Sequence, residues 1–236
     1  MSELPLRSLP RVFVPGATAE DVIELPSSEV DKIRKVLRLG SGAQIAVLPD
    51  DGSIIRCEFT GRDAKPLSVE RPDVEPNLKL TIIQALPKGD KLDEIVRACT
   101  EIGAAKFVVF PSERTIVKWD DKKVVDRLHR LSTIAREAAE VSFRTRLPKI
   151  SYLPSMSSAL KASPNTLVLS EIEGEERLLT RTGGEMAIMV GPEGGWSKKE
   201  IELIGTRGVS LGPRVLRVDH AAAAAAAILL LKHSSH

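Results

Sequence analysis

Gly191-Pro192-Glu193-Gly194-Gly195-Trp196 and Leu211-Gly212-Pro213-Arg214-Val215-Leu216-Arg217 are the two stretches on which the fold of this 236-residue chain depends. Each follows a short apolar run, at residues 187–190 and 209–211, and each precedes a helical pattern. Both stretches are therefore predicted to be loops at the carboxyl ends of strands. In an open parallel sheet, ligands bind at that edge.

The first stretch has features of a ligand-binding turn. Its adjacent glycines permit positive φ angles and let backbone N–H groups approach a ligand closely. Ser197 and Glu200 follow with the spacing of a capping box, which predicts a helix start. The glycine spacing fits neither a Walker-type phosphate loop nor a dinucleotide fingerprint, so it disfavours nucleoside triphosphates and dinucleotides. An ordinary turn before a helix is the alternative interpretation.

Composition sets limits on partners and location. With 34 basic and 32 acidic residues the formal charge is +2, so any nucleic-acid binding must come from local patches. Cys57 and Cys99 lack metal or disulfide spacing, and the four histidines form no paired motif, so we expect no metal site. The chain begins without a secretion signal, and the apolar run at 221–231 is too short to cross a bilayer, so a cytoplasmic protein without membrane contact is expected.

Residues 1–74 are predicted to form a small β-barrel domain. Short strand-like runs occur at 11–14, 43–48, 53–60 and 67–70, separated by glycine- and proline-containing turns. A helical pattern at 28–39 interrupts them, with Val30, Ile33, Val36 and Leu37 on one face. Residues 73–77, which include Pro76, are predicted to be a linker.

Residues 75–236 are predicted to form an α/β domain with a parallel sheet. Strands expected at 78–86, 106–110 and 166–170 alternate with helices expected at 90–102 and 121–141. The seven alanines of the run at 221–227 favour a helix. That helix could approach a threaded loop or a partner subunit closely, or it could pack inside the domain.

Basic residues gather in two places. Four lie within seven residues of the first predicted helix, and residues 112–149 carry 10 basic against 6 acidic side chains. Both are candidate surfaces for an RNA backbone, and solvated helix charges are the alternative. The candidate RNA-binding residues are Arg11, Lys32, Arg34, Lys35, Arg38, Arg144 and Arg146.

Together, the two stretches resemble the SPOUT superfamily of S-adenosylmethionine-dependent RNA methyltransferases, and within it the enzymes that methylate N3 of a uridine in 16S ribosomal RNA. Residues 36–39, 85–91, 100–103, 112–114 and 137–140 are also similar to that family, so the resemblance covers nearly the whole chain. It implies a C-terminal trefoil knot, a homodimer through the C-terminal domain, and a PUA-like RNA-binding domain at residues 1–74. It also implies action on the small ribosomal subunit near the decoding site.

The resemblance and the loop positions together define a candidate site. The residues expected to bind S-adenosylmethionine are Leu169, Ser170, Glu171, Val190, Gly191, Pro192, Glu193, Gly194, Gly195, Leu211, Gly212, Leu216, Arg217 and Ala221. Arg217 and Arg11 are expected to stabilise charge on the uracil oxygens. Asp219 is either the base that accepts the N3 proton or the N-cap of the alanine helix. His220 is an alternative base.

The chain departs from the family pattern in two places. Val218-Asp219-His220 stands where the family usually has Thr-Glu-Thr, and Val141 stands where it commonly has Gln. Two alternatives therefore stay open beside the N3-uridine enzyme. One is a SPOUT methyltransferase that modifies another RNA atom, and the other is a non-catalytic RNA-binding assembly factor. Trp196 could stack on a base or pack beneath its loop.

Overall fold

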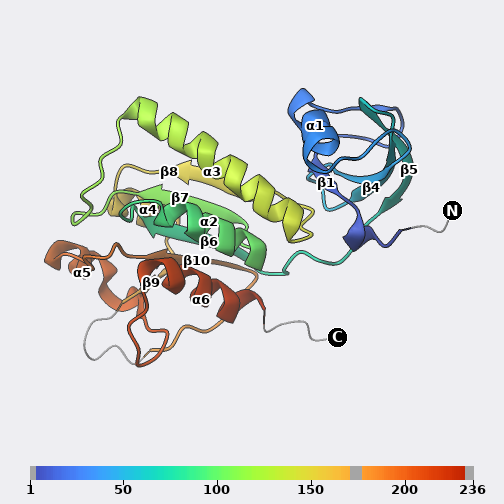
Figure 1. Cartoon of the computed structure of the whole chain (residues 1–236). Helices are drawn as coiled ribbons and strands as arrows, with labels where there is room; N and C mark the ends of the chain where they lie inside the picture. The colour runs from blue at the N-terminus through green and yellow to red at the C-terminus, as the bar shows by residue number, and fades with distance from the viewer. Residues whose placement is uncertain (1–3, 171–176, 232–236) are drawn as a thin grey trace. The chain divides into compact units, whose positions relative to one another are not determined.

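The structure is a computed structural model that describes residues 4–170 and 177–231, and it divides into two compact units (Figure 1). Unit 1 comprises Met1–Glu75 and Ala139–Leu147, and unit 2 comprises Pro76–Ala138 and Pro148–His236. The first division falls inside the predicted linker. The segment Ala139–Leu147 groups with unit 1, although the sequence suggested a single division of the chain at residue 74.

Unit 1 contains a curled, mainly antiparallel sheet. In the described part of the chain this sheet has five strands in the order β1-β3-β4-β5-β2. Only β1 and β3 pair in parallel. Alternate side chains point inward and form one apolar core with Ile33 of the neighbouring helix. The strands are β1 (Arg11–Phe13), β2 (Ile23–Glu24), β3 (Gln44–Leu48), β4 (Ile54–Phe59) and β5 (Asp63–Glu70).

Two elements of unit 1 differ from expectation. The last predicted strand begins at Asp63 rather than at residue 67, because Pro66 is accommodated where the β4–β5 register shifts between Arg56 and Cys57. The predicted helix at 28–39 is two elements, α1 (Ser27–Asp31) and the π-helix η2 (Lys32–Val36). A short 3-10 helix, η1 (Leu6–Ser8), precedes β1.

Polar contacts anchor the segment Ala139–Leu147 in unit 1. The Glu140 carboxylate accepts hydrogen bonds from the Phe13 N–H at 3.1 Å and from the Lys32 ammonium. The Arg11 guanidinium donates to the backbone carbonyls of Glu140 and Val141. These carbonyls end a helix and have no intrahelical donors, so Arg11 acts as their cap.

Unit 2 is built on a parallel sheet, as predicted. Its six described strands follow the order β11-β9-β10-β6-β7-β8, and each paired neighbour is parallel. The sequence pattern missed β8, because only four residues form it at the sheet edge and they are half-buried. The strands are β6 (Lys79–Ala85), β7 (Lys106–Phe110), β8 (Lys149–Tyr152), β9 (Thr166–Leu169), β10 (Glu185–Val190) and β11 (Gly208–Val209).

Helices cover both faces of this sheet. Along β6, Leu80 and Ile82 face one apolar core with residues of α2, α3 and α6, whereas Ile83 and Ala85 face a second core with α4 and α5 (Figure 1). A layered α/β architecture results. The helices are α2 (Lys91–Ile102), α3 (Asp121–Val141), α4 (Met156–Ala162), α5 (Lys198–Ile204), η3 (Gly205–Arg207) and α6 (Val218–Leu230).

The alanine-rich helix α6 packs inside unit 2. Ala222, Ala225 and Ala226 are buried, and the helix lies against α2. Their small side chains permit this close approach. None of the helices in the described ranges combines the length and apolar character required to cross a membrane.

Candidate active site

The two glycine-bearing loops line one cavity. The first loop (residues 191–196) follows β10 and the second loop (residues 211–217) follows β11, and β9 lies between these strands in the sheet. Because all three strands run parallel, their carboxyl ends meet at one edge. The cavity has a volume of about 850 Å³, within the range of small-molecule sites.

The first loop has a shape that depends on its glycines. Gly195 has a φ of +64°, and a Cβ added to Gly191 would lie 3.1 Å from the Trp196 ring. Trp196 is buried, stacks on Phe110, and donates from Nε1 to the Leu169 carbonyl at 3.0 Å. Of the two interpretations of this tryptophan, the structure therefore supports packing beneath the loop.

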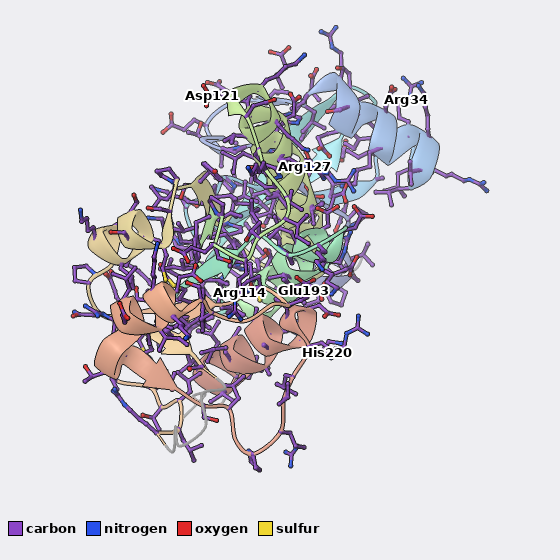
Figure 2. All side chains as sticks on the ribbon, turned by 90° about the vertical axis from the view of Figure 1, so that its left-hand side faces the viewer. Arg34, Arg114, Asp121, Arg127, Glu193 and His220 are labelled. Carbon is purple, nitrogen blue, oxygen red and sulfur yellow. The ribbon has the colours of Figure 1, made fainter. Side chains whose placement is uncertain are left out.

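Glu193 ties the first loop to the start of α2. Its carboxylate accepts from the Lys88 N–H at 3.2 Å and from the Lys91 ammonium at 2.7 Å. Burial by itself would raise the pKa of Glu193, but these donors hold that pKa below its usual value. Lys91 also lines the cavity, which its position in the sequence did not suggest, because it is the first residue of α2 and lies 102 residues before Glu193 in the chain. Figure 2 labels Glu193 and also Arg114, whose guanidinium donates to the carbonyl of the next residue of the first loop, Gly194.

The second loop leads directly into α6. Gly212 has a φ of +115°, a conformation that L side chains rarely adopt. Arg217 is the N-cap residue and α6 begins at Val218, so the interpretation of Asp219 as the N-cap is wrong. The backbone is extended at Arg217, so α6 begins two residues earlier than an N-cap at Asp219 would require, and Asp219 lies in the first turn.

Charged groups cluster on that first turn. Asp219 Oδ1 lies 3.5 Å from Arg217 Nε, and Asp219 Oδ2 lies 3.7 Å from His220 Nε2. A hydrogen bond from its own backbone N–H, together with the neighbouring Arg217 guanidinium, holds the pKa of Asp219 below its ordinary value. Asp219 Oδ1 is shielded from solvent and accepts no hydrogen bond within the described residues. Such an oxygen is ready to accept a donor from a ligand.

The structure brings most of the predicted cofactor residues together. Of the residues predicted to bind the cofactor, Gly194 does not line the cavity, and Glu171 lies outside the described residues. Arg11, which was predicted to act on the uracil, belongs to unit 1. Sequence reasoning did not include Trp196, Ile201, Val209, Ser210, Pro213, Arg214, Val215 or Val218 among the ligand contacts, although they also line it. The predicted residues that line the cavity are Leu169, Ser170, Val190, Gly191, Pro192, Glu193, Gly195, Leu211, Gly212, Leu216, Arg217 and Ala221.

The predicted RNA-binding residues fall into two groups. Arg34, Lys35 and Arg38 have exposed side chains on or beside η2. Lys32 is partly buried against Glu140, and Arg144 is only 5% exposed with its guanidinium bonded to Glu75.

Arg146 is exposed, and it donates to the Asp51 carbonyl at 2.7 Å. In the described structure, Lys32 and Arg144 therefore stabilise unit 1, and the exposed trio is better suited to contact phosphate.

The donor atoms of the cavity are those of an organic ligand site. Within residues 4–170 and 177–231 no group of three or more His, Cys, Asp or Glu side chains is arranged to hold a metal ion. Apolar side chains of Leu169, Val190 and Leu216 alternate with backbone groups of the two loops around the cavity. This mixture suits a small molecule with a flat apolar part and a polar end.

Comparisons with known proteins agree with this geometry. Residues 74–230 match the family model of the RNA methyltransferase domain. Ribosomal RNA small subunit methyltransferase E of Bacillus subtilis is 32% identical over 229 residues, covering 86% of this chain and 90% of the relative. The protein of that name from Synechocystis is 33% identical, covering 87% of this chain and 72% of the relative.

A solved structure is similar over the same extent. Ribosomal RNA small subunit methyltransferase E from Neisseria gonorrhoeae, bound to S-adenosyl methionine, has a TM-score of 0.83 and 29% identity, covering 93% of this chain and 95% of that one. Fold and cavity thus define the class of RNA methyltransferases. Within that class, the chain belongs to the family of ribosomal RNA small subunit methyltransferase E.

Proposed function

We propose that the protein is an S-adenosylmethionine-dependent methyltransferase that acts on N3 of a uridine in 16S ribosomal RNA, near the decoding site of the small subunit. The observation that carries this proposal is the single cavity formed by both glycine-bearing loops in a member of this family. We also propose that it acts in the cytoplasm, where its RNA substrate is found.

The residues of the cavity fit the cofactor. The apolar side chains of Leu169, Val190 and Leu216 would contact the adenine, and N–H groups of the two loops would hold the polar ends. When bound, S-adenosylmethionine supplies an electrophilic methyl group. The protein then contributes alignment, which needs few ionisable side chains around the methyl donor.

Asp219 and Arg217 have distinct proposed roles toward the uracil. The shielded Oδ1 of Asp219 would accept the N3 proton, since it has no hydrogen-bond donor among the described residues. The exposed Arg217 guanidinium would stabilise negative charge on a uracil oxygen.

Arg11 was predicted to assist Arg217, but its guanidinium already donates four hydrogen bonds inside unit 1. We propose a supporting role for it, through the end of α3.

For unit 1 we propose a PUA-like RNA-binding domain. Its curled sheet and the exposed Arg34, Lys35 and Arg38 support this assignment. Phosphate contacts by three cations would make RNA binding salt-dependent, with a slope reduced by about one for each arginine or lysine replaced. Binding of a small-subunit RNA fragment at several salt concentrations tests it.

For unit 2 we propose a trefoil knot at the C-terminal end and a homodimer. The second loop followed at once by the tightly packed α6 supports the knot. Exposed apolar side chains at Val215, Ile228 and Leu231 support burial against a second copy. Sedimentation equilibrium tests the dimer. An experimental structure whose C-terminal chain passes through no loop would contradict the knot.

The decisive experiment is methyl transfer to small subunits isolated from cells that lack this activity. Labelled methyl groups should appear in 16S ribosomal RNA, and mass spectrometry of the nucleosides should give 3-methyluridine. A different methylated nucleoside would refute the N3 assignment. S-adenosylmethionine binding without any methyl transfer would instead favour a non-catalytic assembly factor.

A further inference from the structure

Three neighbouring segments hold the first loop, although none of its own residues belongs to a helix or strand. Glu193 binds the start of α2, and Trp196 binds the end of β9. The third segment is the loop after β7, residues 112–115, which lies outside the cavity lining and has no part in the chemistry proposed above.

Arg114 supplies the first contact from this third segment. Its Nη1 donates to the Gly194 carbonyl at 2.6 Å. A Cβ added to Gly194 would lie 3.4 Å from the Arg114 Cβ, so the arginine stem lies against the loop backbone. The contact fixes the peptide unit between Gly194 and Gly195, two residues with few conformational restraints of their own.

Glu200 supplies the second contact. Its side chain is only 3% exposed. Oε2 accepts from the Ser197 N–H at 2.8 Å and completes the capping box of α5, while Oε1 accepts from the Glu113 N–H at 3.0 Å. One carboxylate therefore caps α5 and joins its start to the loop after β7. The capping box alone would need only one of these two oxygens.

We propose that Arg114 and Glu200 are positioning residues for methyl transfer, which hold the first loop in its ligand-binding shape before the cofactor arrives. Arg114 fixes the glycine pair and Glu200 fixes the point where the loop enters α5. A loop ordered in advance loses less conformational freedom on binding, so affinity and alignment both improve. This inference rests on the proposed assignment of the first loop to S-adenosylmethionine.

The test compares Arg114→Ala with Glu113→Ala in the full-length protein. Glu113 is exposed and contributes only its backbone N–H to the contact, so its alanine variant is a matched control. Hydrogen exchange of residues 191–196 is measured without ligand, and S-adenosylmethionine affinity is measured by calorimetry. In Arg114→Ala we expect faster loop exchange and affinity about tenfold weaker. Glu113→Ala should match the wild type, and Arg114→Lys should recover part of the affinity.

Glu200→Gln provides a second test, with the exposed Glu202→Gln of the same helix as its control. An amide can accept only one of the two backbone hydrogen bonds, so this variant should also speed loop exchange and raise KM for S-adenosylmethionine. A purely structural role would instead lower the thermal midpoint and leave KM unchanged. Wild-type loop exchange and affinity in both Arg114→Ala and Glu200→Gln would overturn the proposal.

Failure of the proposed function gives a different result. If the first loop does not bind the cofactor, saturating S-adenosylmethionine will not slow exchange of residues 191–196 in the wild type. If only the positioning role is wrong, the ligand will protect the loop in the wild type and equally in the Arg114→Ala protein.

Discussion

At the scale of single residues, Asp219 combines two properties that matter for the chemistry. Its pKa lies below the ordinary value, so the carboxylate is charged throughout the neutral range. Its Oδ1 is shielded and accepts no hydrogen bond among the described residues. Arg217 Nε lies 3.5 Å from this oxygen and partly compensates its charge, so the open acceptor position of Oδ1 can receive a donor from a ligand.

Replacing Asp219 by alanine should reduce kcat by about 10²- to 10⁴-fold, because a positioned base would be lost. S-adenosylmethionine affinity should change little, since Asp219 does not line the cavity. Steady-state kinetics and calorimetry on the same preparation measure the two effects. Activity of Asp219→Ala equal to that of the wild type would show that another group takes the proton.

The pH dependence of the methylation rate distinguishes Asp219 from His220 as the base. The pKa of Asp219 lies below its ordinary value of 3.8, so the carboxylate is ionised at any pH above 3.8. Protonation of Asp219 would therefore reduce activity only at more acidic pH. Imidazoles titrate roughly between pH 5.5 and 7.5. In that range the methylation rate should therefore show no acid limb from Asp219. An acid limb there that disappears in His220→Ala would make His220 the base instead.

At the scale of elements, hydrophobic periodicity was most informative where an element is long and one-sided. It predicted α2, α3 and β7 to within a residue, because each buries one regular face or most of a strand. It missed β2 and α4, and it merged α1 with η2. A strand of two residues and a helix of seven carry too few periods to stand out, and a π-helix does not follow the 3.6-residue repeat.

Helix α6 should tolerate added volume only on its outer side. Ala225 is fully buried where α6 packs on α2, so Ala225→Leu should destabilise unit 2 by about 1–3 kcal/mol through overpacking. Ala227→Leu, on a half-buried position of the same helix, is the matched control. Both tryptophans, Trp119 and Trp196, belong to unit 2, so fluorescence during urea unfolding reports on this unit. Equal stabilities would contradict the packing described for α6.

The end of α3 gives a pH prediction with a defined sign. Burial raises the pKa of Glu140 despite the opposing effect of Lys32. The folded state therefore binds the proton more tightly than the unfolded state, and stability falls as pH rises through the raised pKa. Relative to the wild type, Glu140→Gln should gain stability as pH increases above 4.5, the ordinary value of this group.

Hydrogen exchange of β1 amides is a suitable measurement for this variant, because the Phe13 N–H of β1 donates a hydrogen bond to the Glu140 carboxylate. Glu137→Gln, which changes an exposed position of the same helix, should show no such pH-dependent gain. The Glu140 assignment fails if the two variants respond alike.

At the scale of the whole molecule, the parallel sheet and the two loops at its edge could be predicted, because strand–loop–helix order places every such loop at the carboxyl end. Contacts between segments that are distant in the sequence could not be predicted. Nothing in the sequence associates Lys91 with Glu193, because that ion pair depends on β6 and β10 becoming neighbours. Nor does it associate Arg144 with Glu75, because that pair depends on the return of Ala139–Leu147 to unit 1. The burial of basic residues also depends on contacts between distant segments, so the predicted RNA-binding residues separate into buried and exposed groups.

Cofactor binding should stabilise unit 2 through mass action. At about 100 times the dissociation constant, S-adenosylmethionine should add about 2.7 kcal/mol to the free energy of unfolding. Tryptophan fluorescence in urea measures the change. Gly212→Val, which forces a branched side chain into a backbone with a φ of +115°, should largely abolish this gain. A full gain in that variant would exclude the second loop from the binding site.

The return of Ala139–Leu147 to unit 1 has a consequence for synthesis of the protein on the ribosome. Leu9, Phe13 and Leu48 form one apolar cluster with Ala139, so the first 75 residues emerge without the segment that completes it. Domains generally fold as units during translation, in order from the N-terminus. Here this cluster can be completed only after residue 147 has left the exit tunnel, and release or cleavage before that point leaves its apolar side chains uncovered for chaperones to bind.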